Sequence, residues 1–216
     1  AGDNAGIIRI RVRLGPTISP KRSIGRHMSD GSGVKVLVLL GSLRAASINR
    51  QLAELAVETS PAGVTLELFD RLGELPFYNE DIDPGNGDPG NGGPEPVAAL
   101  REAAARADAA LVVTPEYNGS IPGVLKNAID WLSRPFGNSA LQGKPMAVVG
   151  AALGRYGGAW AHDETRKSFG IAGARIVEDL HLSIPAKSLD GEHPREHAEI
   201  AQRLGEVVGT LVAEVD

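Results

Sequence analysis

The sequence predicts an α/β fold in which a doubly wound, five-stranded parallel sheet is covered by helices on both faces. Two observations support this fold class. Short apolar segments alternate with longer amphipathic ones along residues 34–216, and the first apolar segment, Val34–Leu40, is almost unbroken. Parallel strands buried on both faces read as continuous apolar runs, and right-handed crossovers place helices on both sides of the sheet.

The first three elements follow from local pattern. Val34–Leu40 consists largely of Val and Leu and ends at Gly41, which predicts a central strand. Residues 49–58 carry apolar side chains at helical spacing, and the Ser-Pro-Ala-Gly segment 60–63 stops this predicted helix. Val64–Phe69 alternates between polar and apolar residues and is the second predicted strand.

A direct repeat interrupts the alternation. Asp-Pro-Gly-Asn-Gly occupies residues 83–87 and recurs at 88–92. Neither a helix nor a strand ladder tolerates this composition, so we expect an exposed loop.

The remaining elements continue the alternation. A Pro at the start of residues 122–132 suits the first position of a helix, and residues 195–212 have an apolar stripe typical of a closing amphipathic helix. The other predicted helices are 96–107 and 158–169, and the other predicted strands are Ala109–Val113, 146–151 and 174–177.

Residues 1–33 differ from the rest of the chain. Their charged side chains are mostly basic, they contain scattered Gly, Pro and Ser, and they have no continuous apolar segment typical of a secretory signal. We expect a disordered or artefactual N-terminal extension, with Met28 as a candidate native start, followed by one domain over residues 34–216.

Composition narrows the function classes. The net charge is −5, which disfavours nucleic acid as a partner, and no apolar run approaches the length needed to cross a membrane. We therefore expect a cytoplasmic protein. The chain has no cysteine, so its chemistry does not use thiols, and electron transfer would require a cofactor.

Ligands of doubly wound sheets bind beyond the carboxyl ends of the strands, where the strand order reverses. The loop after the first strand carries Ser42, Arg44, Ser47 and Asn49 and opens a helix, so hydroxyls, an amide, a guanidinium and backbone N–H groups converge as an anion site. It lacks both the Gly-Lys-Ser/Thr ending of a Walker A loop and the G-x-G-x-x-G glycines, which favours a terminal monophosphate. An ordinary Ser-capped helix is the alternative.

Two further loops follow the third and fourth strands. The loop after the third strand would expose main-chain N–H groups to the N5 and carbonyl edge of an isoalloxazine ring, with Tyr117 stacked on it; a purely structural turn is the alternative. Its candidate residues are Pro115, Glu116, Tyr117, Asn118, Gly119 and Ser120. The glycine-rich loop after the fourth strand offers Gly154, Tyr156 and Gly157, either for close approach to a ligand or as a flexible helix entry.

At these residues the sequence resembles the NAD(P)H-dependent FMN reductase family, which includes quinone, azo and chromate reductases. Gly-Ser-Leu-Arg at 41–44, with Ser47 and Asn49, is similar to its phosphate loop. Pro-Glu-Tyr-Asn at 115–118 and Lys-Asn-Ala-Ile-Asp-Trp at 126–131 are similar to its flavin loop and the helix that follows. The resemblance runs from about residue 34 to residue 185, and the doubled insert departs from it.

The resemblance implies a flavodoxin-like fold, FMN as cofactor and NAD(P)H as co-substrate, with a flavin, quinone or similar small molecule as electron acceptor. It also implies a homodimer or homotetramer in which the helix 122–131 packs between subunits. No protein side chain would act as a catalytic acid or base, because the flavin carries the chemistry. A flavodoxin-type electron carrier and a non-catalytic FMN-binding sensor are the alternatives.

The remaining motifs favour neither a zinc site nor a serine nucleophile. His-Pro-Arg-Glu-His at 193–197 matches the H-x-x-E-H pattern of zinc proteases, but Pro194 would leave His193 outside the helix. We expect His162 and His181 to be surface or structural residues. A serine nucleophile lacks the G-x-S-x-G pattern.

Overall fold

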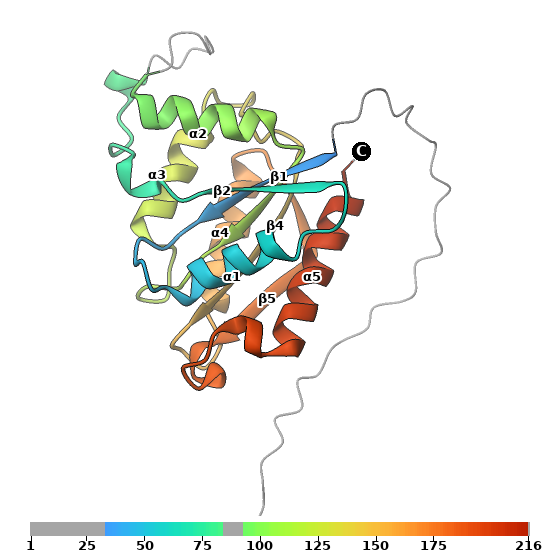
Figure 1. Ribbon diagram of the computed structural model, residues 1–216. Helices are drawn as coiled ribbons and strands as arrows, with labels where there is room; N and C mark the ends of the chain where they lie inside the picture. The colour runs from blue at the N-terminus through green and yellow to red at the C-terminus, as the bar shows by residue number, and fades with distance from the viewer. Residues whose placement is uncertain (1–32, 84–92, 216) are drawn as a thin grey trace, which may run out of the picture. The chain divides into compact units, whose positions relative to one another are not determined.

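A parallel sheet of five strands forms the centre of the part of the chain that the computed structural model describes, residues 33–83 and 93–215 (Figure 1). The strand order is β2-β1-β3-β4-β5, which confirms the predicted doubly wound sheet. The strands are β1 (Val34–Leu40), β2 (Val64–Phe69), β3 (Ala109–Val113), β4 (Pro145–Ala152) and β5 (Arg175–Pro185). The predicted N-terminal extension, except Gly33, and the doubled insert, except Asp83, lie outside the described residues.

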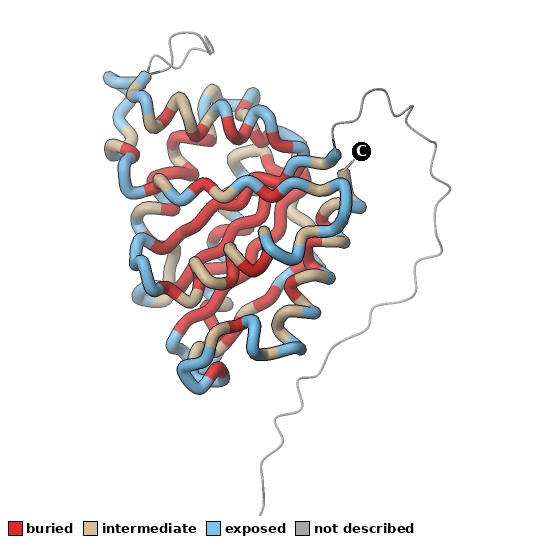
Figure 2. Tube along the Cα trace, in the orientation of Figure 1, coloured by how far each residue is buried: buried red, intermediate tan, exposed pale blue. Residues whose placement is uncertain are grey.

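Helices cover both faces of this sheet. One face of the sheet is covered by α1 (Ile48–Glu58) and α5 (Ala198–Ala213), and the other face is covered by α2 (Glu95–Arg106), α3 (Gly123–Leu132) and α4 (Ala159–Ile171). Two apolar clusters result, one on each side, and Figure 2 shows the strands as the buried centre between them. The all-apolar pattern of β3, with every residue buried, follows from this double coverage.

The order of the strands determines where a site can form. β1 pairs with β2 on one side and with β3 on the other, both in parallel. The chain leaves β1 toward α1 and leaves β3 toward α3, which lie on opposite faces. The loops after these two adjacent strands therefore diverge, and a ligand can bind between them.

The prediction for the fifth strand was too short. β5 continues from Arg175 to Pro185, whereas the sequence predicted only residues 174–177. The pairing is irregular between Met146–Ile176 and Val148–His181, and the exposed Glu178 and Asp179 within this irregularity resemble a loop in sequence. An edge strand tolerates such residues because one of its sides meets solvent.

The start of the last helix also differs from the prediction. A short 3₁₀ turn, Pro194–Glu196, precedes α5, which begins at Ala198 rather than at Arg195. His197 separates the two with φ −102° and ψ 92°, a backbone conformation that no α-helix contains.

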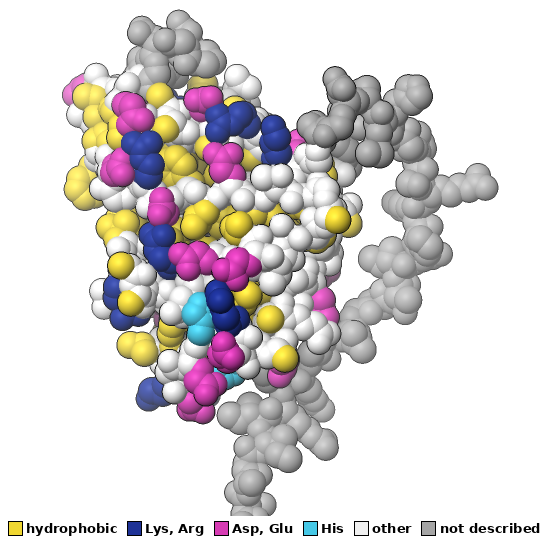
Figure 3. All heavy atoms as spheres, in the orientation of Figure 1, with side chains coloured by type: hydrophobic (Ala, Val, Ile, Leu, Met, Phe, Trp, Pro, Cys, Tyr) yellow, Lys and Arg dark blue, Asp and Glu magenta, His cyan; other side chains and the backbone are white. Residues whose placement is uncertain are grey.

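Ion pairs are frequent on the surface. Basic and acidic side chains are interspersed on the face shown in Figure 3. Among the described residues, Arg50 contacts Asp70 at 2.9 Å and Arg195 contacts Glu58 at 3.1 Å. None of the helices in the described ranges has the length and apolar character required to cross a bilayer.

Candidate functional site

The loop after β1 presents unpaired backbone donors. Ser47 is the N-cap of α1, and its hydroxyl oxygen accepts a hydrogen bond from the N–H of Asn49 at 3.1 Å. Within the described part of the chain, the N–H groups of residues 42–46 have no hydrogen-bond acceptor. These donors lie at the positive end of the α1 dipole, a combination that favours an anion.

Arg44 is the free cation of this loop. Its side chain is exposed and makes no hydrogen bond or ion pair with any described residue, whereas the nearby Arg50 is bound to Asp70. The guanidinium of Arg44 is therefore available to an external anion.

The three other predicted residues of the loop, Ser42, Ser47 and Asn49, are buried. Ser47 caps α1, and Ser42 lies beneath the loop surface. The amide of Asn49 donates to the carbonyl of Ala151 at 2.9 Å and accepts from its N–H at 2.8 Å. Asn49 thus joins the start of α1 to the end of β4, a role that the sequence did not predict.

The loop after β3 is a tight hairpin. Tyr117 and Ser120 form two backbone hydrogen bonds, of 3.1 and 3.0 Å, around Asn118 and Gly119. The two central residues have φ values of 53° and 74°, which define a type I′ turn and explain the Asn-Gly dipeptide. The predicted tight loop is thereby confirmed in its backbone form.

Side chains of this hairpin hold it against α4. Glu116 accepts a hydrogen bond from the N–H of Ala161 at 3.2 Å, and the Ser120 hydroxyl donates to Glu164 at 2.6 Å. The N–H groups of Glu116, Asn118 and Gly119 have no acceptor among the residues described. The main chain of the hairpin, rather than its polar side chains, is thus available to a ligand.

The loop after β4 lies beside the hairpin. Gly157 has φ 63°, and a Cβ at this position would approach the backbone of Ile184 to 2.5 Å, so glycine is required. Tyr156 is about half exposed and lies 5.8 Å from the ring of Trp160. Gly154, Tyr156 and Gly157 are not among the residues that line the cavity between the β1 and β3 loops.

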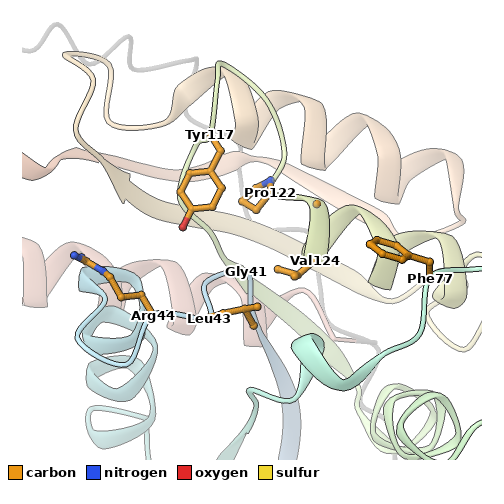
Figure 4. Close-up of a pocket in the computed structure, with 8 residues that line it drawn as sticks. Gly41, Leu43, Arg44, Phe77, Tyr117, Pro122 and Val124 are labelled. Carbon is orange, nitrogen blue, oxygen red and sulfur yellow. The ribbon is translucent and has the colours of Figure 1, made fainter.

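A cavity of about 290 Å³ opens between the β1 and β3 loops. Figure 4 shows Tyr117 on one side, Arg44 and Leu43 below it, and Phe77 at the opposite end. Its lining residues are Gly41, Leu43, Arg44, Phe77, Tyr117, Pro122, Gly123 and Val124. The cavity combines one free cation with mostly apolar walls, as ligand pockets usually do.

The sequence reasoning missed Phe77. It lies on the segment after β2, which α3 holds in place: Trp131 donates from its indole N–H to the carbonyl of Pro76 at 2.8 Å. Phe77 itself is 85% exposed. Its place in the wall of the cavity, rather than its exposure, indicates a binding role, because singly exposed apolar side chains are common on protein surfaces.

His162 is completely buried on the first turns of α4. Its Nε2 lies 3.0 Å from the carbonyl oxygen of Thr114, and its Nδ1 lies 2.7 Å from the hydroxyl of Ser183. Burial lowers the pKa of His162 to about 4. The expected structural role is therefore confirmed for this residue, which lies directly under the β3 loop.

The two histidines of the H-x-x-E-H pattern act separately. His193 precedes the 3₁₀ turn and accepts from the N–H of Arg195 at 3.1 Å, while His197 lies 3.3 Å from the carbonyl of Leu189. No group of three or more metal-ligating side chains occurs within residues 33–83 and 93–215.

Comparison with protein families gives one match over most of the chain. The model of the family described as NADPH-dependent FMN reductase matches residues 34–188. These bounds agree with the extent of the resemblance seen in the sequence, and they include the β1, β3 and β4 loops.

Individual proteins that are similar to this chain have names consistent with this family. A quinone reductase of Pseudomonas putida is 46% identical over 133 residues, 62% of this chain and 68% of that protein. An NAD(P)H-dependent FMN reductase of Pseudomonas aeruginosa is 45% identical over 141 residues, 65% of this chain and 71% of that protein. The solved structure of FerB, a flavoenzyme NAD(P)H:(acceptor) oxidoreductase from Paracoccus denitrificans, aligns with TM-score 0.70 and 32% identity over 84% of this chain and 97% of FerB.

Proposed function

Because this chain belongs to the NADPH-dependent FMN reductase family, we propose that it oxidises NAD(P)H through FMN bound at the cavity between the β1 and β3 loops, with a quinone as electron acceptor. FMN-dependent NAD(P)H oxidoreductase activity follows from the family. The place of the flavin, the residues that hold it and the acceptor are the proposal. The observation that carries it is the meeting of Arg44 and Tyr117, from the loops after two adjacent strands, in one cavity.

The phosphate of FMN would bind at the start of α1. The unpaired N–H groups of residues 42–46 and the guanidinium of Arg44 form a donor set for a single phosphate. Asn49 would contribute indirectly, because its amide is bound to Ala151 and fixes the start of the helix.

The isoalloxazine ring would lie against the β3 hairpin. The free N–H groups of Glu116, Asn118 and Gly119 offer donors to the polar edge of the ring, and the exposed ring of Tyr117 offers a stacking surface. When bound, FMN supplies the chemistry by taking a hydride from the nicotinamide and passing the electrons to the acceptor. The protein would position the ring, provide charged groups and exclude solvent.

A quinone suits the remaining walls of the cavity. Leu43, Phe77 and Val124 are apolar and surround the space beside Tyr117, so a flat apolar acceptor would be buried between them. The quinone reductase of P. putida supports this acceptor class by its similarity.

We also propose a homodimer or homotetramer in the cytoplasm. Large apolar side chains near the site are more than half exposed, among them Tyr117, Leu153, Tyr156 and Trp160. Such a cluster beside the cavity is typical of a surface that another subunit covers.

The acceptor assignment is tested with steady-state kinetics. Purified protein should oxidise NADPH or NADH with 1,4-benzoquinone as acceptor. Tyr117→Ala should raise the quinone KM about fivefold through the lost ring contact, worth about 1 kcal/mol, while Tyr117→Phe keeps the ring and the KM. Phe136→Ala, an exposed aromatic outside the cavity, is the control. The assay contains saturating FMN, because Tyr117 also faces the proposed place of the flavin ring. An unchanged quinone KM in Tyr117→Ala under this condition would remove Tyr117 from the acceptor site.

A further inference from the structure

His162 contacts the base of the β3 loop from below. The ring belongs to α4 and lies 3.0 Å from the carbonyl oxygen of Thr114, the residue that immediately precedes Pro115. Thr114 is itself fixed to the sheet, because its N–H donates to the carbonyl of Val149 at 3.0 Å. The β3 loop therefore leaves the sheet from a residue whose N–H group and carbonyl oxygen are both hydrogen-bonded.

The hydrogen-bond partners define the tautomer of the ring. A carbonyl oxygen accepts only, so Nε2 carries the proton that it donates to Thr114. Nδ1 then accepts from the hydroxyl of Ser183 on β5, at 2.7 Å. The low pKa of His162 agrees with this neutral form: burial lowers the pKa most, and the charges of Arg166 and His181 lower it further, whereas the hydrogen bond to Thr114 and the charge of Asp163 raise it.

The space for the ring is set by two glycines. A Cβ added at Gly150 would lie 2.9 Å from Nε2, and one added at Gly158 would lie 3.1 Å from the same atom. The ring therefore fills a position that the backbone of β4 and the start of α4 leave open, and it cannot shift without moving its neighbours.

Other contacts between α4 and the hairpin lie nearer the solvent. Glu116 binds the N–H of Ala161, and Ser120 binds the carboxylate of Glu164, which is exposed. Hydrogen bonds in such positions contribute less than a buried one, whose loss leaves a carbonyl without a partner. The His162–Thr114 bond is thus the contact through which α4 fixes the loop most firmly.

We propose that His162 is a positioning residue for the flavin: its hydrogen bond to Thr114 sets the position of the β3 loop and thereby the affinity and reduction potential of FMN. The inference rests on the proposed place of the flavin ring. His162 does not touch the ring, because it is completely buried beneath the loop that would carry it.

Two amide substitutions separate this role from simple filling of the core. In His162→Gln the amide nitrogen reaches the position of Nε2 and keeps the bond to Thr114, whereas in His162→Asn the shorter amide reaches only the position of Nδ1 and Ser183. Neither side chain titrates. Ser183→Ala is the matched control, since it removes the bond to Nδ1 and leaves Thr114 bound.

FMN binding to each apoprotein would be measured by quenching of flavin fluorescence, well below the melting temperature of the least stable variant, together with the midpoint potential. We expect the FMN Kd to rise about tenfold in His162→Asn, the loss of roughly one buried hydrogen bond. His162→Gln and Ser183→Ala should stay within about twofold of the native Kd and keep its potential.

An FMN Kd and potential in His162→Asn equal to the native values would overturn the inference and leave His162 a purely structural residue. If His162→Asn does not fold, His162→Leu carries the same test, because it fills the space without a donor. Arg44→Ala, measured in parallel, distinguishes the two proposals: weaker FMN binding there with native binding in His162→Asn refutes only the role of His162.

Discussion

The side-chain oxygen of Asn127 accepts a hydrogen bond from the backbone N–H of Tyr78 at 2.8 Å, while its amide nitrogen donates to the carbonyl of Pro76 at 3.0 Å. One buried amide on α3 thus holds both sides of Phe77. The exposed aromatic wall of the cavity depends on this contact, because the segment after β2 has no regular structure of its own here.

Replacing Asn127 with Ala should lower the free energy of unfolding by about 2 kcal/mol, because it leaves backbone groups of the 75–78 segment without partners. The neighbouring Lys126→Ala removes only an exposed pair with Asp130 and should cost less than about 0.5 kcal/mol. Urea denaturation of both variants measures the difference. Equal costs would show that the amide contributes no more than the surface pair.

Arg44→Ala should raise the FMN Kd about tenfold or more, because a charge-assisted hydrogen bond contributes about 1.5–3 kcal/mol. Arg44→Lys should recover part of the affinity by charge alone. Flavin fluorescence titration at low and high salt measures both effects. Arg50→Ala is the control, since Arg50 is bound to Asp70; if it weakens FMN as much as Arg44→Ala, the assignment to Arg44 fails.

Two glycine substitutions should change the free energy of unfolding in opposite directions. A Cβ at Gly150 would come within 2.0 Å of the carbonyl oxygen of Thr114, so Gly150→Ala should destabilise by about 3 kcal/mol through overpacking. Gly205 lies in α5 with open space around it, and Gly205→Ala should stabilise by about 0.5–1 kcal/mol by reducing the entropy of the unfolded chain. Thermal and chemical unfolding test both values, and a tolerated Gly150→Ala would contradict the close packing of β3 and β4.

The free energy of unfolding should fall at acidic pH because the folded state lowers the pKa of His162. Its pKa is about 4 in the folded state and about 6.5 when unfolded, so between these values the unfolded chain binds a proton that the folded chain does not. The stabilisation is present above pH 6.5 and decreases as pH falls toward 4, by about 3 kcal/mol in total. His162→Gln lacks this titration, so the stability difference between the native protein and this variant should shrink over the same range. A difference independent of pH would mean that His162 titrates normally in the folded protein.

The sequence predicted the strands and turns that depend on local pattern. β1, β2 and β3 have their predicted bounds because their apolar runs end at turn residues, and Asn118-Gly119 forms the tight turn that this dipeptide favours. β5 was predicted too short because Glu178 and Asp179 do not resemble a strand when the irregular edge pairing is unknown.

The parts of the site that depend on distant contacts could not be predicted. The sequence assigned Asn49 to the cofactor from its place at a helix start, but its amide is used by Ala151, far along the chain. The positioning role of His162 gave no signal because its partners come from distant parts of the chain, Thr114 from the loop after β3 and Ser183 from β5. Phe77 was missed because nothing in a Pro-Phe-Tyr segment shows that α3 will fix it beside the β1 loop.

The visible spectrum of the purified protein, recorded without oxygen before and after addition of NADPH or NADH, is the decisive measurement for FMN-dependent turnover at this site. Protein reconstituted with FMN should show bound-flavin absorption that at least one nicotinamide bleaches and that a quinone restores. A protein that binds no FMN, or whose bound flavin stays oxidised with both nicotinamides, would contradict the proposed oxidoreductase function.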